Sequence, residues 1–387
     1  MHILTLTPFY PSTANQVRGC FVTEPLRALE KIGVRSSVIA VSPIYHPRVQ
    51  PLPSSPALWV RYPQIPGNIG LSNAGRWLYA RLLPKVSRLH KENPIDVIHA
   101  HAALPCGHAA ALLSQRLRIP FVVTLHGLDV FNTCFLSGAP AKWRRKASMN
   151  VYRAARSVIC ISDKVSRLLL DGMQGRVQTE IVYNGTDTDL FSPDITEASS
   201  PKGPEILVVG NLAVGKGHEL VFRAIDRLKV LFPVLSCRVI GEGADRVRFE
   251  ALVRELGIAD RVRFEGTRSR KEVAQAMQAC SVFVLPSRNE GLGCVYLEAM
   301  ACGKPVIACR GQGIDAIIKH GENGWLIPSW SAPDDAVEEL VQGLSSLLSS
   351  ADLRSNIGAA ARETILGQFT LSHQAQGLAR IYRKAIA

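Results

Sequence analysis

The sequence predicts an α/β protein built from two doubly wound domains, each a parallel sheet covered by helices. Three observations predict this. The 387 residues exceed what one hydrophobic core usually organises and suit two domains. Short apolar runs alternate with helical patterns along both halves of the chain. A polar, proline-rich stretch at 191–204 separates the halves.

The runs that predict strands are continuous in Val, Ile and Leu, which is typical of strands buried on both faces of a parallel sheet. They are HILTLTPF, SSVIAVS, DVIHAH, FVVTLHG, SVICIS and TEIVYNG in the first half, and EILVVGN, LSCRVIG, VRFEG, SVFVLPS, PVIAC and GWLIP in the second. Helical patterns between them include TEPLRALEKIG, HELVFRAIDRLKVLF and RKEVAQAMQACS. We expect domains at 1–190 and 205–367, a linker at 191–204, and a last helix within 368–387. Ligands of such sheets bind beyond the carboxyl ends of the strands.

Composition favours a folded cytoplasmic protein. Hydrophobic residues make up 47% of the chain and charged residues 20%, which excludes a disordered chain. The nine cysteines are scattered without a CxxC pair, so reduced thiols are expected rather than disulfides or a zinc site. The apolar runs are too short to span a bilayer, and the N-terminal residues do not show the pattern of a signal peptide.

The positive charge is concentrated in the first half. Residues 1–190 hold 22 Lys and Arg against 10 Asp and Glu, whereas residues 191–387 hold 23 against 22. Such a field attracts anionic lipid surfaces, lipid phosphates or nucleic acid, but no nucleic-acid-binding motif is present. NAGRWLYARLLPKVSRLH (73–90) and PAKWRRKASMNVYRAAR (140–156) place Trp, Tyr and Leu among basic residues at helical spacing. They favour an anionic membrane surface or a lipid-linked acceptor; buried tryptophans with solvated basic groups are the alternative.

Two segments of the second half suggest nucleotide-binding motifs that they do not complete. GNLAVGKG (210–217) has the spacing of a P-loop, but Gly217 stands where a Ser or Thr should meet magnesium. GEGADR (241–246) has Arg246 where the third glycine of a dinucleotide fingerprint belongs. Both still describe strand-to-helix turns that suit a phosphate, and Lys216 is either a phosphate ligand or a solvated lysine.

The segment NEGLGCVYLEAMACGKPV at 289–306 carries the most specific signal. It follows an apolar run, so its glycines form a turn into a helix whose N-terminus offers partial positive charge. Glu290 and Glu298 are eight positions apart, roughly 12 Å at a rise of about 1.5 Å per helical residue. A carboxylate at each end suits the hydroxyl pairs of a nucleotide sugar. The alternatives are an ordinary N-terminal helix acid at Glu290 and a solvated residue at Glu298.

This segment resembles the E-x7-E motif of the family-4 retaining glycosyltransferases, and the resemblance runs the length of the chain. The other matching segments are PFYPSTANQVRGCFVTE, DVIHAH, TLHG, VYNGTDTDLF, VVGNLAVGKGHEL and FVLPSRNEGLG. The resemblance implies the GT-B fold, with two facing Rossmann-like domains and a C-terminal helix that crosses back to the first. It implies transfer of a sugar from a nucleotide donor, and we expect a hexose-type sugar carried by UDP or GDP. Together with the basic first half, it favours a glycan or lipid-linked acceptor, as in cell-envelope or exopolysaccharide biosynthesis. It further implies retention at the anomeric carbon, no metal or other cofactor, and a cytoplasmic enzyme, peripheral at the inner face of the plasma membrane if its basic half binds lipid.

The resemblance also assigns residues to the donor. Glu298 would bind the ribose, Glu290 the hydroxyls of the transferred sugar, and Lys216 the diphosphate. Backbone N–H groups would contact the donor at Gly291, Leu292 and Gly293. From the first domain, Gly19 would lie near the phosphates and His126 would contact the sugar at the reacting centre.

One position departs from the family pattern. Asn211 stands where the family often has an arginine that shares the diphosphate with the lysine. Asn211 donates hydrogen bonds without bringing charge, so either Lys216 and the helix dipole suffice, Arg288 compensates, or the enzyme is weak. The rival to an active transferase is therefore a catalytically inert nucleotide-sugar-binding paralogue. An epimerase or phosphorylase of the same fold is disfavoured by the E-x7-E spacing and the chain length.

His99 and His101 invite a metal interpretation, since alternate residues of a strand share a face. His108 follows closely, but no carboxylate or cysteine is placed to complete a site. We therefore expect these histidines to line the site as strand-end side chains.

Overall fold

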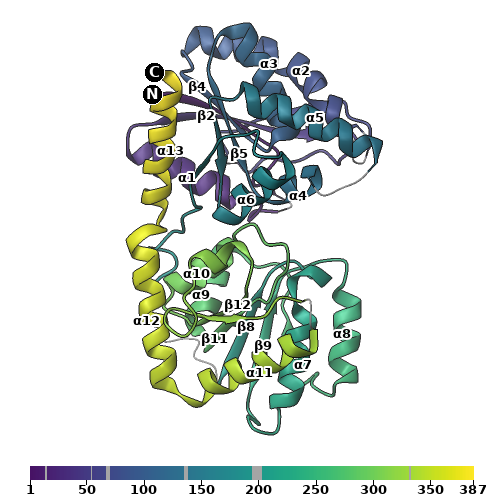
Figure 1. Cartoon of the computed structure of the whole chain (residues 1–387), viewed down its shortest axis with the longest axis vertical. Coiled ribbons are helices and arrows are strands. Elements are labelled where there is room, and N and C mark those ends of the chain that lie inside the picture. The colour runs from purple at the N-terminus through teal and green to yellow at the C-terminus, as the bar shows by residue number, and fades with distance from the viewer. Residues whose placement is uncertain (14, 54, 67–69, 135–137, 194–202, 331–332) are drawn as a thin grey trace. The chain divides into compact units, whose positions relative to one another are not determined.

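The computed structural model describes residues 1–13, 15–53, 55–66, 70–134, 138–193, 203–330 and 333–387 (Figure 1). They form two compact units, one of Met1–Asn184 with Leu371–Ala387 and one of Gly185–Thr370. The unit boundary therefore falls between Asn184 and Gly185. Most of the expected linker lies outside the described residues, since these omit 194–202.

The first unit contains a fully parallel seven-stranded sheet in the order β3-β2-β1-β4-β5-β6-β7. The strands are β1 (His2–Thr7), β2 (Arg35–Pro43), β3 (Leu58–Tyr62), β4 (Val97–His101), β5 (Phe121–Leu125), β6 (Ser157–Cys160) and β7 (Thr179–Ile181). The strand order reverses between β1 and β4, which makes their carboxyl ends the switch point where ligands of open α/β sheets bind.

Strand β3 was not predicted from the sequence. It lies at one edge of its sheet and pairs with β2, with Val60 opposite Val41. Its side chains are only partly covered, and Leu58 is exposed. Trp59 packs edge-on against Tyr10, with ring centroids 6.4 Å apart.

The helices of the first unit follow the strands in chain order, except that the last comes from the end of the chain. They are α1 (Cys20–Lys31), α2 (Leu71–Glu92), the short turn η1 (Ala103–Gly107), α3 (His108–Leu117), α4 (Leu128–Cys134), α5 (Ala139–Ala154), α6 (Asp163–Gly172) and α13 (Leu371–Ile386). Helix α13, yellow in Figure 1, lies beside α1. Its Leu378, Ile381 and Tyr382 share one buried cluster with β-strand residues such as Ile3 and Val122. A segment distant in sequence therefore completes this core.

The second unit contains a parallel six-stranded sheet in the order β10-β9-β8-β11-β12-β13. Its strands are β8 (Glu205–Val209), β9 (Ser236–Ile240), β10 (Val262–Phe264), β11 (Val282–Val284), β12 (Val306–Cys309) and β13 (Trp325–Ile327). Its helices are η2 (Val214–Lys216), α7 (His218–Leu228), α8 (Arg246–Glu255), α9 (Arg270–Ala279), α10 (Cys294–Ala301), η3 (Gly313–Ala316), α11 (Pro333–Ser349) and α12 (Ala351–Gln368). The switch point here lies between β8 and β11.

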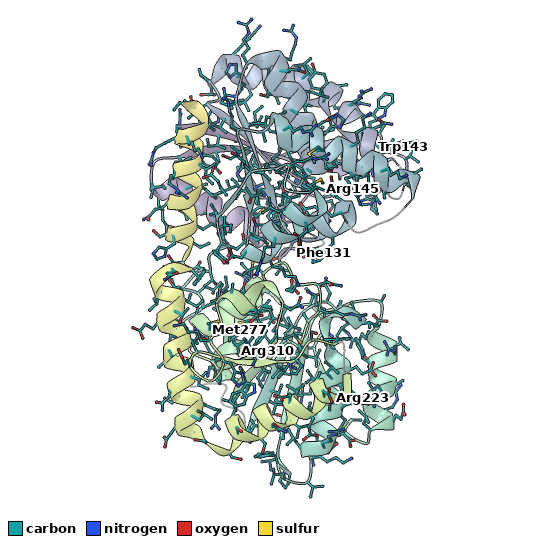
Figure 2. The ribbon with its side chains drawn as sticks, viewed as in Figure 1. Phe131, Trp143, Arg145, Arg223, Met277 and Arg310 are labelled. Atoms are coloured by element: carbon teal, nitrogen blue, oxygen red, sulfur yellow. The ribbon has the colours of Figure 1, made fainter. Side chains whose placement is uncertain are left out.

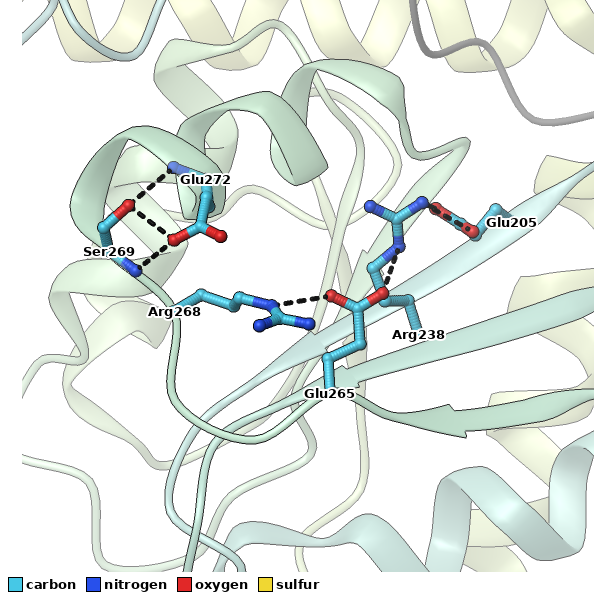
Figure 3. Close-up of polar contacts among 6 residues, drawn as sticks. All are labelled: Glu205, Arg238, Glu265, Arg268, Ser269 and Glu272. Atoms are coloured by element: carbon cyan, nitrogen blue, oxygen red, sulfur yellow. Dashed lines mark hydrogen bonds and ion pairs between the residues drawn. The ribbon is translucent and has the colours of Figure 1, made fainter.

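A chain of ion pairs links the first strands of this sheet to the start of α9 (Figure 3). Arg238 lies between Glu205 and Glu265, at 3.2 and 3.5 Å, and Arg268 contacts Glu265 at 3.2 Å. Ser269 and Glu272 then form a capping box at the N-terminus of α9. This fixes the first residue of α9, Arg270, beside α10.

None of the helices within the described ranges is long and apolar enough to cross a membrane.

Candidate active site

The loops that follow β8 and β11 meet at the switch point of the second unit. The backbone N–H of Arg288 donates to the carbonyl of Gly215 at 2.9 Å, which joins the two loops. Lys216, at the end of the first loop, lies 2.5 Å from a carboxylate oxygen of Glu290 in the second. Both side chains are largely buried, with 29% and 17% of their surfaces exposed. Two residues assigned from sequence to different parts of a donor are therefore bonded to each other.

The glycine that breaks the P-loop pattern has a steric reason to be glycine. Gly217 has φ +83°, and a Cβ there would lie 2.3 Å from the carbonyl oxygen of Pro286. The loop after β8 thus packs directly on the strand end that leads to Glu290, which holds Lys216 in place.

The GEGADR turn supports the same loop. A Cβ on Gly241 would lie 2.0 Å from the Gly210 carbonyl oxygen, and a Cβ on Gly243 would lie 2.2 Å from that of Leu212. The carboxylate of Asp245 accepts a hydrogen bond from the Val214 N–H at 2.9 Å. Gly241 and Gly243 are therefore glycines because a side chain at either position would clash with the backbone that leads to Lys216.

Glu290 precedes the helix rather than belonging to its first turn. Helix α10 begins at Cys294, and Gly293 at its N-cap has φ +81°. The backbone of Glu290 is held on both sides, because its N–H donates to Gln312 Oε1 at 2.9 Å and its carbonyl accepts from the Gly313 N–H at 3.2 Å. The alternative of an ordinary N-terminal helix acid is wrong for this residue. Leu292 is buried, and the first turn of α10 contains no acidic residue.

Glu298 is 2% exposed, so the alternative of a solvated residue is also wrong. One carboxylate oxygen contacts the Arg270 guanidinium at 2.5 Å, and the guanidinium lies 4.7 Å from the centroid of the Phe191 ring. The other oxygen, Oε2, is buried and has no hydrogen-bond partner within the described part of the chain. A buried carboxylate oxygen without a donor is costly and fits an acceptor for a ligand hydroxyl.

The two residues discussed for the missing arginine differ in their surroundings. Asn211 is exposed at the end of β8. The guanidinium of Arg288 lies 4.8 Å from the centroid of the Trp330 ring, whose Nε1 donates to the Pro286 carbonyl at 2.7 Å. The backbone of Arg288 thus bonds to the loop that carries Lys216, and its side chain stacks on Trp330.

In the first unit, Gly19 and His126 are each close to Phe9, in the loop after β1. Gly19 has φ +75°, and a Cβ there would lie 2.5 Å from the Phe9 carbonyl oxygen. The rings of Phe9 and Phe21 lie 5.5 and 4.8 Å from that of His126. The N–H groups of His126 and Gly127 donate to Asp129 Oδ1 at 3.1 and 2.9 Å, which fixes the turn after β5.

His99 and His101 share one face of β4, with ring centroids 4.4 Å apart. His101 Nδ1 lies 2.9 Å from His126 Nε2, so the strand-end histidines line the surroundings of His126. Within the described ranges, no group of His, Cys, Asp and Glu side chains is arranged to hold a metal ion.

Sequence reasoning singled out the two carboxylates, the lysine and His126, but not Arg270 and Gln312, which contact Glu298 and Glu290. Neither belongs to a motif of its own, and each reaches the site only through folding. Lys216, Glu290 and Glu298 lie in the second unit together with their partners. Gly19, His126 and the strand-end histidines lie in the first unit.

Comparison with known proteins identifies the family. The model described as Glycosyltransferase Family 4 matches residues 21–190, and that described as Glycosyl transferases group 1 matches residues 194–364. An uncharacterized glycosyltransferase of Methanocaldococcus jannaschii is 30% identical over 291 residues, covering 75% of this chain and 76% of that protein. The chain is a family-4 glycosyltransferase. A D-inositol 3-phosphate glycosyltransferase of Stackebrandtia nassauensis is 31% identical over 310 residues, covering 75% of this chain and 68% of that protein.

Solved structures show the fold of this glycosyltransferase. Anabaena HepE, in complex with UDP and glucose, superposes with a TM-score of 0.77 at 20% identity, covering 98% of both chains. The predicted GT-B fold, with two Rossmann-like units, is confirmed.

Proposed function

We propose that this glycosyltransferase moves a hexose-type sugar from a nucleoside-diphosphate donor to an acceptor with retention at the anomeric carbon. One observation carries the proposal: the loops at the switch point of the second unit pair Lys216 with Glu290, and the adjoining helix α10 holds a buried Glu298 with one oxygen that has no partner among the described residues. An ammonium group suits a diphosphate, and carboxylates suit hydroxyl pairs. The HepE structure, solved with UDP and glucose, supports a UDP-linked sugar as the first donor to test.

The proposed roles follow the geometry of each group. Glu298 Oε2 accepts from a ribose hydroxyl, because it is buried, none of the described residues donates to it, and Arg270 already holds the other oxygen. Lys216 and Asn211 contact the diphosphate, and Glu290 contacts the transferred sugar. Backbone N–H groups of Gly291, Leu292 and Gly293, just before α10, contact the donor, and the N-terminus of α10 adds partial positive charge.

The chemistry required of these residues is positioning and charge neutralisation. The bond between the anomeric carbon and the diphosphate oxygen breaks, a bond to the acceptor oxygen forms on the same face, and the proton of the acceptor hydroxyl passes to the departing phosphate oxygen. Lys216 and the α10 N-terminus offset the negative charge that grows on the leaving phosphate. Gly19 is proposed to allow close approach of the first unit's backbone to the phosphates, and His126 to contact the sugar. No metal or other cofactor has a role in this proposal.

Two substitutions test the proposed site. We expect Glu298→Ala to weaken nucleotide binding, because the ribose loses its acceptor, and His126→Ala to spare donor binding while lowering turnover. Binding is measured by calorimetry with UDP, GDP and ADP sugars, and turnover by release of the nucleoside diphosphate. A thermal-shift screen ranks the donors first, since a ligand at 100 times its Kd stabilises by about 2.7 kcal/mol. Full turnover in His126→Ala would contradict the placement of the reacting centre.

A catalytically inert nucleotide-sugar-binding protein is the second candidate. Asn211 brings no charge, and Lys216 is bonded to Glu290, which leaves the diphosphate with little free positive charge. Donor hydrolysis or transfer by the purified protein, absent in Glu290→Gln, separates the two. Binding without turnover in the unmodified protein would establish the second candidate.

For the acceptor, we propose a glycan or a lipid-linked molecule in cell-envelope or exopolysaccharide biosynthesis. The basic excess of the first unit supports an acceptor that carries phosphate, and the Stackebrandtia relative is named for a phosphate-bearing acceptor. A panel of phosphorylated and unphosphorylated acceptors tests this; equal rates on both would contradict a role for the basic unit.

A further inference from the structure

Three histidines of the first unit form a continuous row at the ends of β4 and β5. The rings of His99 and His101 lie 4.4 Å apart, and those of His101 and His126 are stacked at 5.2 Å with an interplanar angle of 15°. His101 Nδ1 and His126 Nε2 are 2.9 Å apart. With Thr124 and Tyr382 the row lines a small cavity of about 20 Å³ inside this unit.

The row is anchored at the end away from His126. His99 Nδ1 bonds the Tyr382 hydroxyl at 2.7 Å, and His99 Nε2 bonds the Thr124 hydroxyl at 2.7 Å. His99, Thr124 and Tyr382 are all buried, so neither ring nor hydroxyl is free to turn. The ring of His101 therefore packs against a fixed neighbour, tilted by 30°, which limits its orientation toward His126.

The histidines are neutral at neutral pH. Burial lowers the pKa of His99 and of His126 to about 3, and it lowers the pKa of His101 well below its usual range. Two neutral imidazoles that share a hydrogen bond hold one proton between them. If His101 donates, His126 carries its own proton on Nδ1; if His101 accepts, His126 Nδ1 has a free lone pair. His126 Nδ1 is buried and has no hydrogen-bond partner among the described residues.

We propose that His101 is a positioning residue, which sets the ring orientation and the tautomer of His126 and so decides whether His126 Nδ1 donates to the sugar or accepts from it. The proposal rests on the proposed role of His126 in the transfer. His101 contacts His126 and acts through it.

A matched pair of substitutions tests the proposal. The side-chain amide of asparagine places a polar atom where Nδ1 of histidine lies, whereas that of glutamine reaches the place of Nε2. We expect His101→Asn to keep kcat within about threefold, and His101→Gln to lower kcat by about 10-fold to 100-fold at unchanged donor KM. With ¹⁵N-labelled histidine, His126 should show one tautomer in the unmodified protein and in His101→Asn, and a mixture in His101→Gln.

Controls separate this proposal from the function on which it rests. His101→Gln in a His126→Ala background should cost nothing further, because His101 acts through His126. The positioning role would be overturned if both His101 variants had the same kcat. It would also be overturned if His101→Gln lowered kcat by the same factor in the His126→Ala background as in the unmodified protein. Unchanged turnover in His126→Ala alone would instead overturn the assignment of His126. Melting temperatures of all variants show whether a loss of kcat reflects unfolding, which would also count against the proposal.

Discussion

Lys216 and Glu290 hold each other at 2.5 Å, although the ammonium suits phosphate oxygens and the carboxylate suits sugar hydroxyls. A bound donor would have to replace this ion pair with two new contacts. After transfer the sugar leaves, and the carboxylate is again available to recapture the lysine. Re-formation of this ion pair thus competes with binding of the nucleoside diphosphate product and favours its release.

This competition predicts that Glu290→Gln binds the nucleoside diphosphate more tightly than the unmodified protein does, while losing sugar transfer. The expected gain is about fivefold, since a partly buried ion pair contributes about 1 kcal/mol. Lys216→Met should weaken binding, and Glu290→Gln should add nothing in that background. Calorimetry on the four proteins measures the cycle. An equal gain from Glu290→Gln in the Lys216→Met background would show that Glu290 acts by charge repulsion alone.

The residues of this site were predictable from the sequence, but their partners were not. A glutamate eight positions before another, in a strand-turn-helix context, suits a nucleotide ligand, and the resemblance to the family's E-x7-E motif narrows this prediction to a nucleotide sugar. The sequence pattern does not show that Lys216 meets Glu290 or that Arg270 meets Glu298, because each pair joins residues brought together only by the sheet order.

The strand-to-helix turn is the element on which both units build their sites. Parallel strands bring their carboxyl ends to one edge, and glycines there let loops touch backbone to backbone. Gly217, Gly241 and Gly243 all face a carbonyl oxygen at 2.3 Å or less from the position of a Cβ. These glycines of GNLAVGKG and GEGADR are therefore required by the packing of the turns.

Gly217→Ala is expected to destabilise the protein by about 1–3 kcal/mol more than Gly33→Ala does, and to weaken donor binding. The two glycines have nearly equal φ values of +83° and +80°, but only Gly217 has an atom near the Cβ position, the Pro286 carbonyl oxygen. The backbone strain of an alanine at positive φ is thus nearly the same at both sites. The difference in unfolding free energy between the two variants therefore measures the clash with the Pro286 carbonyl oxygen. Denaturant unfolding and calorimetry measure both variants. Similar losses at both sites would mean that the loop after β8 yields without moving Lys216.

Twelve strands of the described chain were predictable because each lies in a short run with Val, Ile or Leu between helical patterns. Strand β3 was not, for two physical reasons. Its buried side chains, Val60 and Tyr62, alternate with less buried ones, so its sequence LWVRY has no continuous apolar run. Prolines at 51, 53, 56, 63 and 66 surround it, and prolines around a short run argue against a strand.

Over the whole molecule, charge is distributed very unevenly. Residues 31–162 contain 17 Lys and Arg but only three Asp and Glu. On α2 and α5, Trp77 and Trp143 are 58% and 59% exposed, which contradicts the alternative of buried tryptophans. Figure 2 labels Trp143 on α5, where the exposed Lys146 and Arg153 follow at helical spacing. On α2, Trp77 is followed by the exposed Arg81, Lys85 and Arg88.

We propose that the exposed tryptophans and basic residues of α2 and α5 form a surface that binds anionic membranes. The lipid phosphates would contact the cations, and the two indoles would enter the membrane interface. Flotation with vesicles of phosphatidylglycerol and phosphatidylcholine should recover the protein at low salt and lose it as salt rises. Lys85→Glu with Lys146→Glu should lower binding about 10-fold or more, at about 1 kcal/mol per basic residue. Arg254→Glu with Arg263→Glu, exposed in the second unit, is the matched control. Equal losses in both variants, or no flotation at low salt, would count against the surface.

The placement of α13 has a consequence for the order in which the chain folds as it is made. Residues 1–184 leave the ribosome first, yet their core cluster includes Leu378, Ile381 and Tyr382. At about 5–20 residues per second, those residues follow roughly 10–40 s later. The second unit, which is continuous from Gly185 to Thr370, has all its residues available earlier. The unit synthesised first is therefore the last to be completed, and the Tyr382 hydroxyl that holds His99 is among the final groups to reach it.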